Sequence, residues 1–358
     1  MGSALLFWHH FRNLKPARQL AVCAAIVLLS GGCGADAKPG GDEPGGAMDK
    51  VTYLTAFGSF GREGFAYVAK QKGFFASRHI DVDIQPGQGA TSNLKLLAAG
   101  RAQFSANDLS GVWILQGSGH YPQMRAVATI QQRTLNSIMT LQKSGITGPK
   151  DLPGKKIGGA PGATPELLWP VYAELVGLDP KAVTWVHMSA QLTPAALASG
   201  KVDGIGQFVV ASGTVEKAAG GRQTRALAYS AVIEDLYGNG LVTTTTMIRD
   251  HPDLVARFRA GLLEGLAWSI QHPQEAGQIL HTMVPTQDGA AAAAELEKMA
   301  PYVVQAGQVG VLDENRVARA VAILAGSGAI PKAPAPDDLV DFGLANGAAP
   351  AVTASGGW

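Results

Sequence analysis

Cysteine is almost missing from this 358-residue chain, which contains only Cys23 and Cys33. Both lie near the N-terminus, so the chain after Cys33 cannot form a disulfide bond within itself. A zinc site built on cysteine pairs is excluded there for the same reason. The fold must therefore be held together by its packed core.

Charge of either sign is also scarce, because charged residues make up 16% of the chain and the formal net charge is +1. Nucleic-acid binding needs a basic patch or stripe, which the sequence lacks. The histidines do not have the spacing of a zinc site, and no G-x-S-x-G motif of a serine hydrolase occurs. We therefore expect no nucleic-acid partner, no metal and no cofactor.

Long hydrophobic runs are absent after residue 33, so no membrane helix is expected there. The N-terminal run at 20–29 follows basic residues and has the length of a signal-peptide core. It ends in LSGGC, a pattern that lipoprotein signal peptidase cleaves before Cys33, although Ser30 stands where an aliphatic residue is commoner. We expect a lipoprotein signal peptide. An ordinary secretory signal with an unmodified Cys33 is the alternative.

Glycine and proline are plentiful, with 45 and 20 residues, and the length exceeds what one hydrophobic core usually organises. The sequence therefore predicts two lobes with many turns, preceded by a flexible tether. Acyl chains on Cys33 would hold these lobes at the outer face of the cytoplasmic membrane, in the cell envelope or periplasm. The predicted parts are a signal peptide (1–32), a tether (33–49), a discontinuous lobe 1 (50–135 and 240–345), lobe 2 (136–239) and a disordered tail (346–358).

Strand and helix patterns alternate in the first predicted lobe. Residues 51–54, 80–84 and 102–108 read as strands, and helical patterns at 62–73 and 91–99 separate them, with Thr91 or Ser92 as a cap. Such β-α-β-α-β units form parallel sheets with helices on their faces. The same layout returns at 155–208, which predicts a second sheet.

The chain then returns to the first lobe. Segments at 124–142 and 236–250 are expected to connect the lobes, and the run Thr243–Thr246 favours extended backbone. Residues 251–273 predict a long helix that begins at Pro252. Its apolar stripe consists of Leu254, Phe258, Leu262, Leu266 and Ile270.

The stretch KKIGGAPGATPELLW, residues 155–169, predicts a strand, a glycine-rich turn and a helix. It has neither the Gly-Lys-Ser/Thr of a P-loop nor G-x-G-x-x-G, so a nucleotide site is not expected. Thr164 can cap the helix with Pro165 as its first residue, and free N–H groups there can receive a ligand oxygen. A capped turn without a ligand is the alternative, and Glu166 weighs against a strongly anionic guest.

The order of these segments resembles the solute-binding proteins of bacterial ABC importers, of periplasmic-binding-protein type II. The branch with the strongest resemblance binds nitrate, taurine, aliphatic sulfonates and thiamine-precursor pyrimidines. The resemblance covers nearly all of 48–342 and rests on YVAKQKGFFASRHIDVDI, NLKLLAAGRAQFSAND, GITGPKDLPGKKIGGAPGAT, LASGKVDG, RDHPDLVARFRAGLLEGLAWSIQHPQEA and VLDENRVARAVAILAGSGAIPKAPAPDDLVD. It implies an α/β fold of two Rossmann-like lobes joined by two crossing strands, with a ligand cleft that closes by hinge rotation.

Ligands of open α/β sheets lie at the carboxyl ends of strands, where the candidate contacts cluster. Phe57 and Phe60 can stack on a flat ring or pack inside the lobe. Arg62 can bind a sulfonate or carboxylate, or pair with Glu63 or a surface acid. Asn107 and Asp108 can accept from ring N–H groups or an ammonium, or form an Asx turn. The candidate ligand-binding residues are Phe57, Ser59, Phe60, Arg62, Thr91, Asn107, Asp108, Gly162, Ala163, Thr164, Ser189, Gln207 and Tyr237.

The resemblance implies a monomeric binding lipoprotein without enzymatic activity, which serves an ABC permease and its ATPase. A pyrimidine or vitamin-like heterocycle is slightly favoured over an aliphatic sulfonate, taurine or nitrate. One alternative is a pyrimidine-precursor synthase of the same fold, whose cysteine-rich motif this chain lacks. Another alternative is a ligand-sensing lipoprotein.

Overall fold

The computed structural model describes residues 47–348 and 350, which belong to one unit, Gly46–Trp358. The predicted signal peptide (1–32), Cys33 and the tether up to residue 46 lie outside the described residues, as does most of the predicted tail. No helix within the described part is long and apolar enough to cross a membrane.

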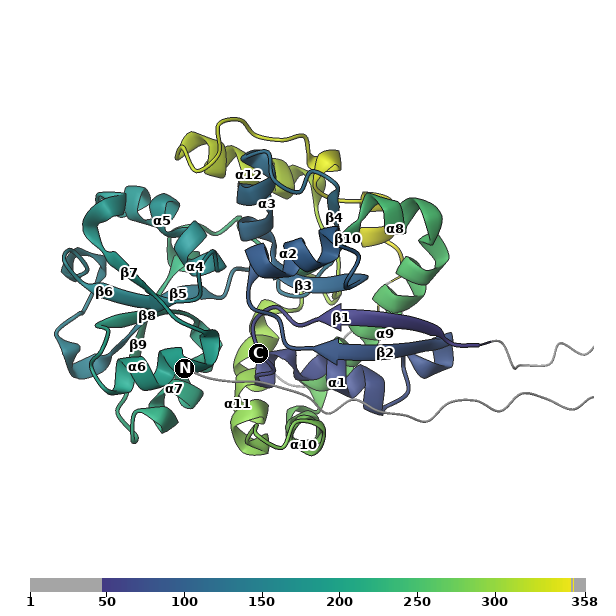
Figure 1. The fold of residues 1–358 in the computed structure, drawn as a ribbon, viewed down its shortest axis with the longest axis horizontal. Coiled ribbons are helices and arrows are strands. Elements are labelled where there is room, and N and C mark those ends of the chain that lie inside the picture. Colours follow the sequence, from purple (N-terminus) through teal and green to yellow (C-terminus); the bar gives the residue numbers. More distant parts are fainter. Residues whose placement is uncertain (1–46, 349, 351–358) are drawn as a thin grey trace, which may run out of the picture. The chain divides into compact units, whose positions relative to one another are not determined.

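The strands form two five-stranded sheets, which Figure 1 shows side by side. The first sheet has the order β2-β1-β3-β10-β4 and the second has the order β7-β6-β8-β5-β9. The strands are β1 (Asp49–Leu54), β2 (Ile80–Gln85), β3 (Phe104–Asp108), β4 (Met124–Thr129), β5 (Asn136–Leu141), β6 (Lys156–Gly159), β7 (Thr184–His187), β8 (Gly204–Phe208), β9 (Thr224–Ala228) and β10 (Asn239–Thr244).

The two sheets share one plan. In the first sheet β2, β1 and β3 run parallel, and β10 is antiparallel to β3 and β4. In the second sheet β7, β6 and β8 run parallel, and β5 is antiparallel to β8 and β9. The chain crosses between the sheets at 130–135 and at 229–238, and these crossing segments bond to each other through Gly238 N–H to the Gln131 carbonyl at 3.0 Å. The predicted α/β fold with two crossing segments is confirmed, but most of the second predicted connection, 236–250, forms β10 and the helix after it.

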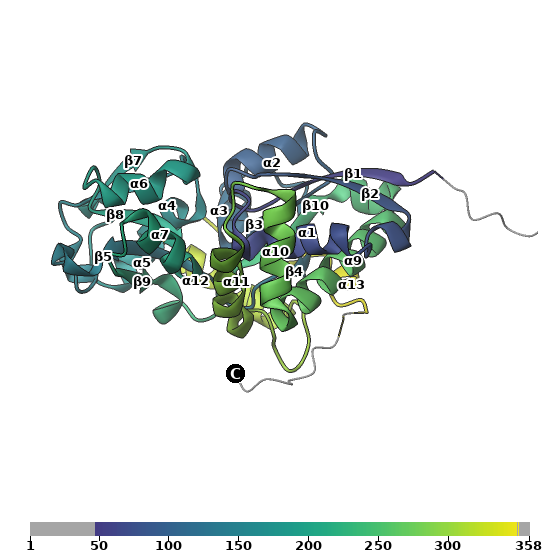
Figure 2. The same ribbon diagram turned by 90° about the horizontal axis from the view of Figure 1, so that it is seen from below.

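Helices cover both faces of the sheets; Figure 2 shows α2 on one side of the first sheet and α1 on the other. Helix α1 packs on α9 and α10, and α11 packs on α10 but also on α7. The limits of the two lobes stay a prediction, because α11 contacts elements beside both sheets. The helices are α1 (Gly64–Gln71), α2 (Ala90–Ala98), α3 (Leu109–Gly117), α4 (Thr164–Leu167), α5 (Trp169–Leu175), α6 (Thr193–Ala198), α7 (Ser212–Ala218), α8 (Thr245–Asp250), α9 (Pro252–Gln271), α10 (Pro273–Met283), α11 (Gly289–Met299), α12 (Glu314–Gly326) and α13 (Phe342–Ala345).

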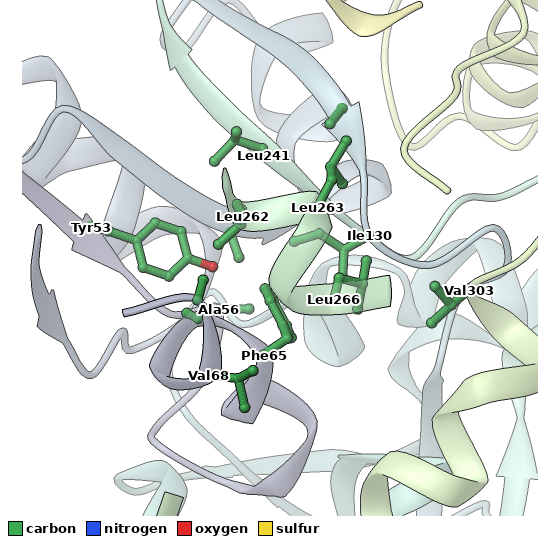
Figure 3. Packing of buried hydrophobic residues seen from close by; sticks show 14 of the residues in the cluster. Tyr53, Ala56, Phe65, Val68, Ile130, Leu241, Leu262, Leu263, Leu266 and Val303 are labelled. Atoms are coloured by element: carbon green, nitrogen blue, oxygen red, sulfur yellow. The ribbon is translucent and has the colours of Figure 1, made fainter. Parts of the chain in front are cut away.

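Helix α9 anchors the core of the first sheet, as its apolar stripe predicted. The Phe258 ring stacks on Phe104, with ring centroids 4.2 Å apart, and on Phe75 at 4.9 Å. Leu262 and Leu266 continue the stripe, and Figure 3 shows them among the buried side chains around Tyr53 and Phe65. These contacts join a helix late in the chain to the first strands, so the first sheet and its helices are discontinuous in sequence.

Two predicted helix starts were wrong by one to three residues. Gly89, rather than Thr91 or Ser92, precedes α2, because the backbone there has φ 97°, a value that glycine adopts without strain. Ala163, rather than Thr164, is the N-cap of α4. In both cases the hydroxyl is left without a capping role, and that of Thr91 donates instead to the Gly162 carbonyl at 3.0 Å.

One further expectation needs correction. The run Thr243–Thr246 is not wholly extended, because β10 ends at Thr244 and its hydroxyl accepts from Met247 N–H at 3.1 Å, which caps α8.

The predicted tail at 346–358 stays a prediction. Among its described residues, the Asn346 amide bonds to Leu312, and Arg259 donates to the Ala348 carbonyl at 2.9 Å.

Candidate functional site

A pocket lies between the two sheets, at the carboxyl ends of β1, β3 and β8. The space between the lining residues, including the part that is open to solvent, is about 330 Å³. The first sheet and α2 contribute Ala56, Phe57, Gly89, Ala90, Asp108 and Asn239, and the second sheet and α4 contribute Ala163, Thr164, Pro165, Gly206, Gln207 and Phe208.

Asp108 is the acidic group of the pocket and ends β3. One carboxylate oxygen accepts from Ser110 N–H at 3.0 Å and thereby caps α3. The other accepts from the Asn136 amide at 2.6 Å and from the Thr134 hydroxyl at 3.2 Å. Asp108 therefore ties the first sheet to a crossing segment and to the start of β5.

Burial raises the pKa of Asp108 to about 7, although the hydrogen bonds from Ser110, Thr134, Gly111 and Asn136 act against this shift. Desolvation disfavours the charged carboxylate more than these donors stabilise it. A neutral carboxyl and a carboxylate are therefore both accessible near neutral pH. Each form can accept a hydrogen bond from a ligand, and the charged form also attracts a cation.

Two amide side chains add polar groups beside Asp108. The Asn239 Oδ1 is buried and has no hydrogen-bond partner among residues 47–348 and 350. Such an acceptor carries a desolvation cost until a donor reaches it. The Gln207 Oε1 accepts from Phe208 N–H at 2.9 Å, so its Nε2 is the atom that can serve another partner. The pocket thus offers acceptors on Asp108 and Asn239, amide donors on Gln207 and Asn239, and the Thr164 hydroxyl.

Phe57 and Phe208 form apolar walls from opposite sides of the pocket. Their ring centroids are 6.3 Å apart with the rings at 63° to each other, an edge-on arrangement. No lysine or arginine is found among the described residues that line the space. The pocket therefore combines aromatic surface with acceptor groups and lacks a basic side chain for an anion.

The pocket contains five of the predicted ligand-binding residues: Phe57, Asp108, Ala163, Thr164 and Gln207. The other eight do not line it: Ser59, Phe60, Arg62, Thr91, Asn107, Gly162, Ser189 and Tyr237. Contact of any of the thirteen with a ligand stays a prediction.

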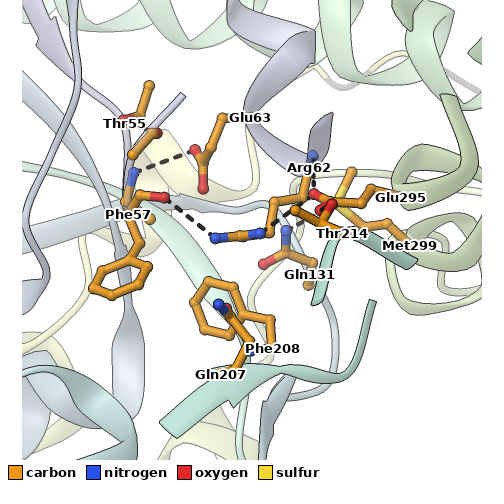
Figure 4. A network of polar contacts seen from close by, with 12 residues as sticks. Thr55, Phe57, Arg62, Glu63, Gln131, Gln207, Phe208, Thr214, Glu295 and Met299 are labelled. Carbon is orange, nitrogen blue, oxygen red and sulfur yellow. Dashed lines mark hydrogen bonds and ion pairs between the residues drawn. The ribbon is translucent and has the colours of Figure 1, made fainter. Parts of the chain in front are cut away.

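Arg62 was expected either to bind an anionic ligand or to lie at the surface, and the surface alternative is wrong. Its side chain is fully buried and forms an ion pair with Glu295 at 3.3 Å. Figure 4 shows the guanidinium directed to Glu295 and to the Phe57 carbonyl, to which Nη2 donates at 3.2 Å. The positive charge of Arg62 is thus paired with Glu295 inside the protein.

Several other candidates have structural partners outside the pocket. The Tyr237 hydroxyl accepts from Asp313 N–H at 3.0 Å, and its ring stacks beneath the Arg316 guanidinium at 4.0 Å. Asn107 donates to the Ser105 hydroxyl at 2.5 Å, because residues two apart in β3 point to the same face, opposite to that of Asp108. The Ser59 hydroxyl bonds to that of Tyr67 at 2.8 Å, and Ser189 is the N-cap residue of a short 3-10 helix.

The glycine-rich turn at 160–163 has partners of its own. Gly162 N–H donates to Glu166 Oε2 at 3.0 Å, and Glu166 Oε1 bonds to His187 at 2.8 Å. Ala163 N–H donates to the Ala160 carbonyl at 3.1 Å. These bonds favour the tight turn over an oxygen cradle, while Ala163 and Thr164 still line the pocket.

Asn239, Phe208 and the small residues around them were missed by sequence reasoning. Asn239 lies opposite Asp108 in the register of β10 and β3, a pairing across 131 positions of sequence that no local pattern reveals. Phe208 follows the predicted strand-end residue Gln207, so the strand end was the available signal. Among the described residues, no group of three or more His, Cys, Asp or Glu side chains could hold a metal ion.

Two curated relatives are similar to this chain. The formylaminopyrimidine-binding protein of Halalkalibacterium halodurans is 26% identical over 219 residues, which cover 61% of this chain and 66% of that protein, just under two thirds of its length. A putative aliphatic sulfonates-binding protein of Bacillus subtilis is 26% identical over 273 residues, or 73% of this chain and 76% of that protein.

Solved structures share the fold. The alkanesulfonate-binding protein SsuA from Xanthomonas axonopodis pv. citri, bound to MOPS, has a TM-score of 0.65 and 18% identity, covering 82% of this chain and 98% of that one. The desulfurization enzyme DszB has a TM-score of 0.55 and 16% identity, covering 84% and 98%. At such identities the likeness shows the periplasmic-binding-protein fold alone.

Residues 63–276, more than half of the chain and most of both sheets, match the family described as NMT1/THI5 like. That stretch includes Asp108, Gln207, Phe208 and Asn239, so the match spans most of the pocket described above. The chain therefore belongs to the NMT1/THI5-like family.

Proposed function

We propose that the protein is the extracytoplasmic solute-binding component of an ABC importer, monomeric and without enzymatic activity. Two α/β sheets with a pocket between them, and relatives named as binding proteins, support this proposal. A ligand that contacts both sides stabilises the closed form by its differential affinity for closed and open forms. The permease and its ATPase then respond to the closed, loaded protein.

The proposed ligand is a neutral or cationic amino-substituted heterocycle, such as a formylaminopyrimidine. The single observation that carries this choice is a pocket with aromatic walls, the acceptors Asp108 and Asn239, and no lining lysine or arginine. A flat ring can pack against the aromatic surface of Phe57 and Phe208, and its amino group satisfies the buried acceptors. A sulfonate would meet the Asp108 carboxylate without a free basic group, because Arg62 is paired with Glu295.

Binding is tested by calorimetry and thermal unfolding with 4-aminopyrimidine, its N-formyl derivative, butanesulfonate and MOPS. We expect the aminopyrimidines to bind and the sulfonates to have no effect. A ligand at 100 times its Kd adds about 2.7 kcal/mol to the free energy of unfolding, which raises Tm by roughly 5 °C. Binding of the sulfonates alone would contradict the ligand class.

Recovery of unchanged ligand after long incubation separates binding from catalysis. DszB has the same fold and is an enzyme, so the fold does not decide between the two. Chromatography of the bound pyrimidine should return the compound added. Turnover at a rate proportional to protein concentration would replace the proposed binding role with an enzymatic one.

We also infer export and lipidation at Cys33, from the run at 20–29 and the LSGGC pattern. Cys33→Ser should move the protein from the detergent-rich to the aqueous phase of a Triton X-114 extraction, because the acyl chains provide the membrane affinity. Cys23→Ser is the matched control and should leave the partition unchanged. Equal partition of Cys33→Ser and the wild type would contradict a lipid anchor at Cys33.

A further inference from the structure

Arg62 and Glu295 form a buried charged pair behind the pocket. Arg62 lies in the 3-10 helix Gly61–Glu63 after β1, and Glu295 lies in α11. The Glu295 Oε2 lies 3.3 Å from Arg62 Nη1 and accepts from the Arg62 backbone N–H at 3.1 Å. Since an unpaired buried charge is costly, each group requires the other.

This pair contacts both aromatic walls of the pocket. Arg62 Nη2 donates to the Phe57 carbonyl, and the guanidinium carbon lies 4.8 Å from the centroid of the Phe208 ring (Figure 4). Phe57 follows β1 of the first sheet, and Phe208 ends β8 of the second. One cation therefore contacts the residues that face each other across the pocket.

Glu295 extends the same network to a helix beside the second sheet. Its Oε1 accepts from the Thr214 hydroxyl of α7 at 2.8 Å. Two exposed contacts flank this bond, from Lys298 to Ser212 at 2.7 Å and from Lys217 to Asp288 at 2.5 Å. Along α7 the residue numbers of these three pairs rise from 212 to 217, while those of their partners fall from 298 to 288. Helices α7 and α11 therefore lie antiparallel. Exposed pairs contribute little to stability, so the Thr214–Glu295 bond is the dominant polar contact of the three between α7 and α11.

We propose that Arg62 and Glu295 are positioning residues that set the gap between Phe57 and Phe208 and, through Thr214, favour the closed form before any ligand binds. The proposal rests on the proposed function, in which the lobes close over a guest. The Thr214–Glu295 bond and the Arg62–Phe208 stack break when the sheets separate. They therefore stabilise only the closed form and raise apparent affinity by raising its population.

Thr214→Val tests this role, because valine keeps the shape of threonine and leaves the Arg62–Glu295 pair intact. Glu295 Oε1 then lacks a donor in the closed form, whereas water reaches it in the open form. We expect the affinity for N-formyl-4-aminopyrimidine to fall about fivefold. Thr193→Val is the matched control, since its buried hydroxyl bonds to the Ala190 carbonyl at 2.9 Å within the same lobe. The control should keep the wild-type affinity.

A distance measurement without ligand separates this inference from the ligand assignment. Spin labels are attached at Leu96→Cys and Leu192→Cys, two positions 40% and 58% exposed, in the full chain with Cys23→Ser and Cys33→Ser. Thr214→Val should shift the ligand-free distance distribution to longer values, and Thr193→Val should not.

Identical distances and affinities in the two variants would overturn the positioning role. A shift in distance without any pyrimidine binding would support the positioning role and overturn the ligand class. Weaker binding of Thr214→Val at unchanged ligand-free distances would also overturn the inference, because the bond would then act at the ligand and not on closure.

Discussion

Asp108→Ala is expected to weaken binding of N-formyl-4-aminopyrimidine at least tenfold and to lower the free energy of unfolding by about 2–4 kcal/mol. The affinity falls because the pocket loses an acceptor, and the stability falls because Asp108 has structural bonds as well. Alanine removes the cap of α3 and leaves the Asn136 amide and Thr134 hydroxyl without their acceptor. Calorimetric titration and urea unfolding measure the two effects.

Asp108→Asn is the informative partner variant, since it mimics the neutral carboxyl. The folded pKa of Asp108 is raised to about 7, so between pH 4 and 7 the folded state binds more protons at this group than the unfolded state does. This extra proton binding stabilises the folded state. The stabilisation is fully present below about pH 4 and is lost as pH rises through 7. Burial also raises the pKa of Glu63 to about 7, which adds a second contribution of the same sign.

Urea unfolding of the wild type from pH 5 to 7.5 should therefore show stability that falls with pH, and Asp108→Asn should show a shallower fall. Glu63→Gln serves as the comparison, because it removes the other contribution at a side chain that does not itself line the pocket. An unchanged slope in Asp108→Asn would mean that the buried carboxyl is not the titrating group. Unchanged affinity in Asp108→Ala would remove Asp108 from the binding site.

Phe258→Ala is expected to lower the free energy of unfolding by about 3–5 kcal/mol, the range for a large buried aromatic residue. Its ring is fully buried between Phe75 and Phe104, and Tyr53 lies 5.7 Å away. The space left cannot collapse easily, because β1, β3 and the segment after α1 hold these neighbours in place. Differential scanning calorimetry and urea unfolding measure the change.

The matched control is Phe74→Ala, which removes the neighbouring, only half-buried ring at the edge of the same cluster. It should cost less than half as much. Because Phe258 lies away from the pocket, refolded Phe258→Ala should keep the wild-type affinity. A loss below about 1 kcal/mol would show that the ring is not the central contact between α9 and the first sheet.

Local patterns located most elements, because periodicity and turn residues report which face of a segment is buried. The stripe from Leu254 to Ile270 predicted α9, and the strand ending at Asp108 was predicted to within a residue or two. Helix caps were less predictable, since Gly89 and Ala163 displaced the hydroxyl residues that usually hold this position. At Gly89 the positive φ favoured glycine, and the Thr91 hydroxyl bonds to the Gly162 carbonyl instead of capping α2.

The pocket was only partly predictable for a similar reason. Asp108 and Gln207 end strands, so each was found from its own segment. Asn239 was not found, because it joins Asp108 through an antiparallel pairing of β10 with β3. Arg62 was assigned to the surface as one alternative, because its partner Glu295 lies 233 positions later in the chain.

The sequence by itself determined the alternation of strands and helices, the two crossing segments and the signal-like N-terminal pattern. These features depend on residues close together in the chain, whose spacing fixes which side chains share a face. The tertiary structure decided which strand ends meet, which polar groups face the pocket and which are used in internal pairs. Those outcomes depend on contacts between distant segments, whose free energy exists only once both sheets have formed.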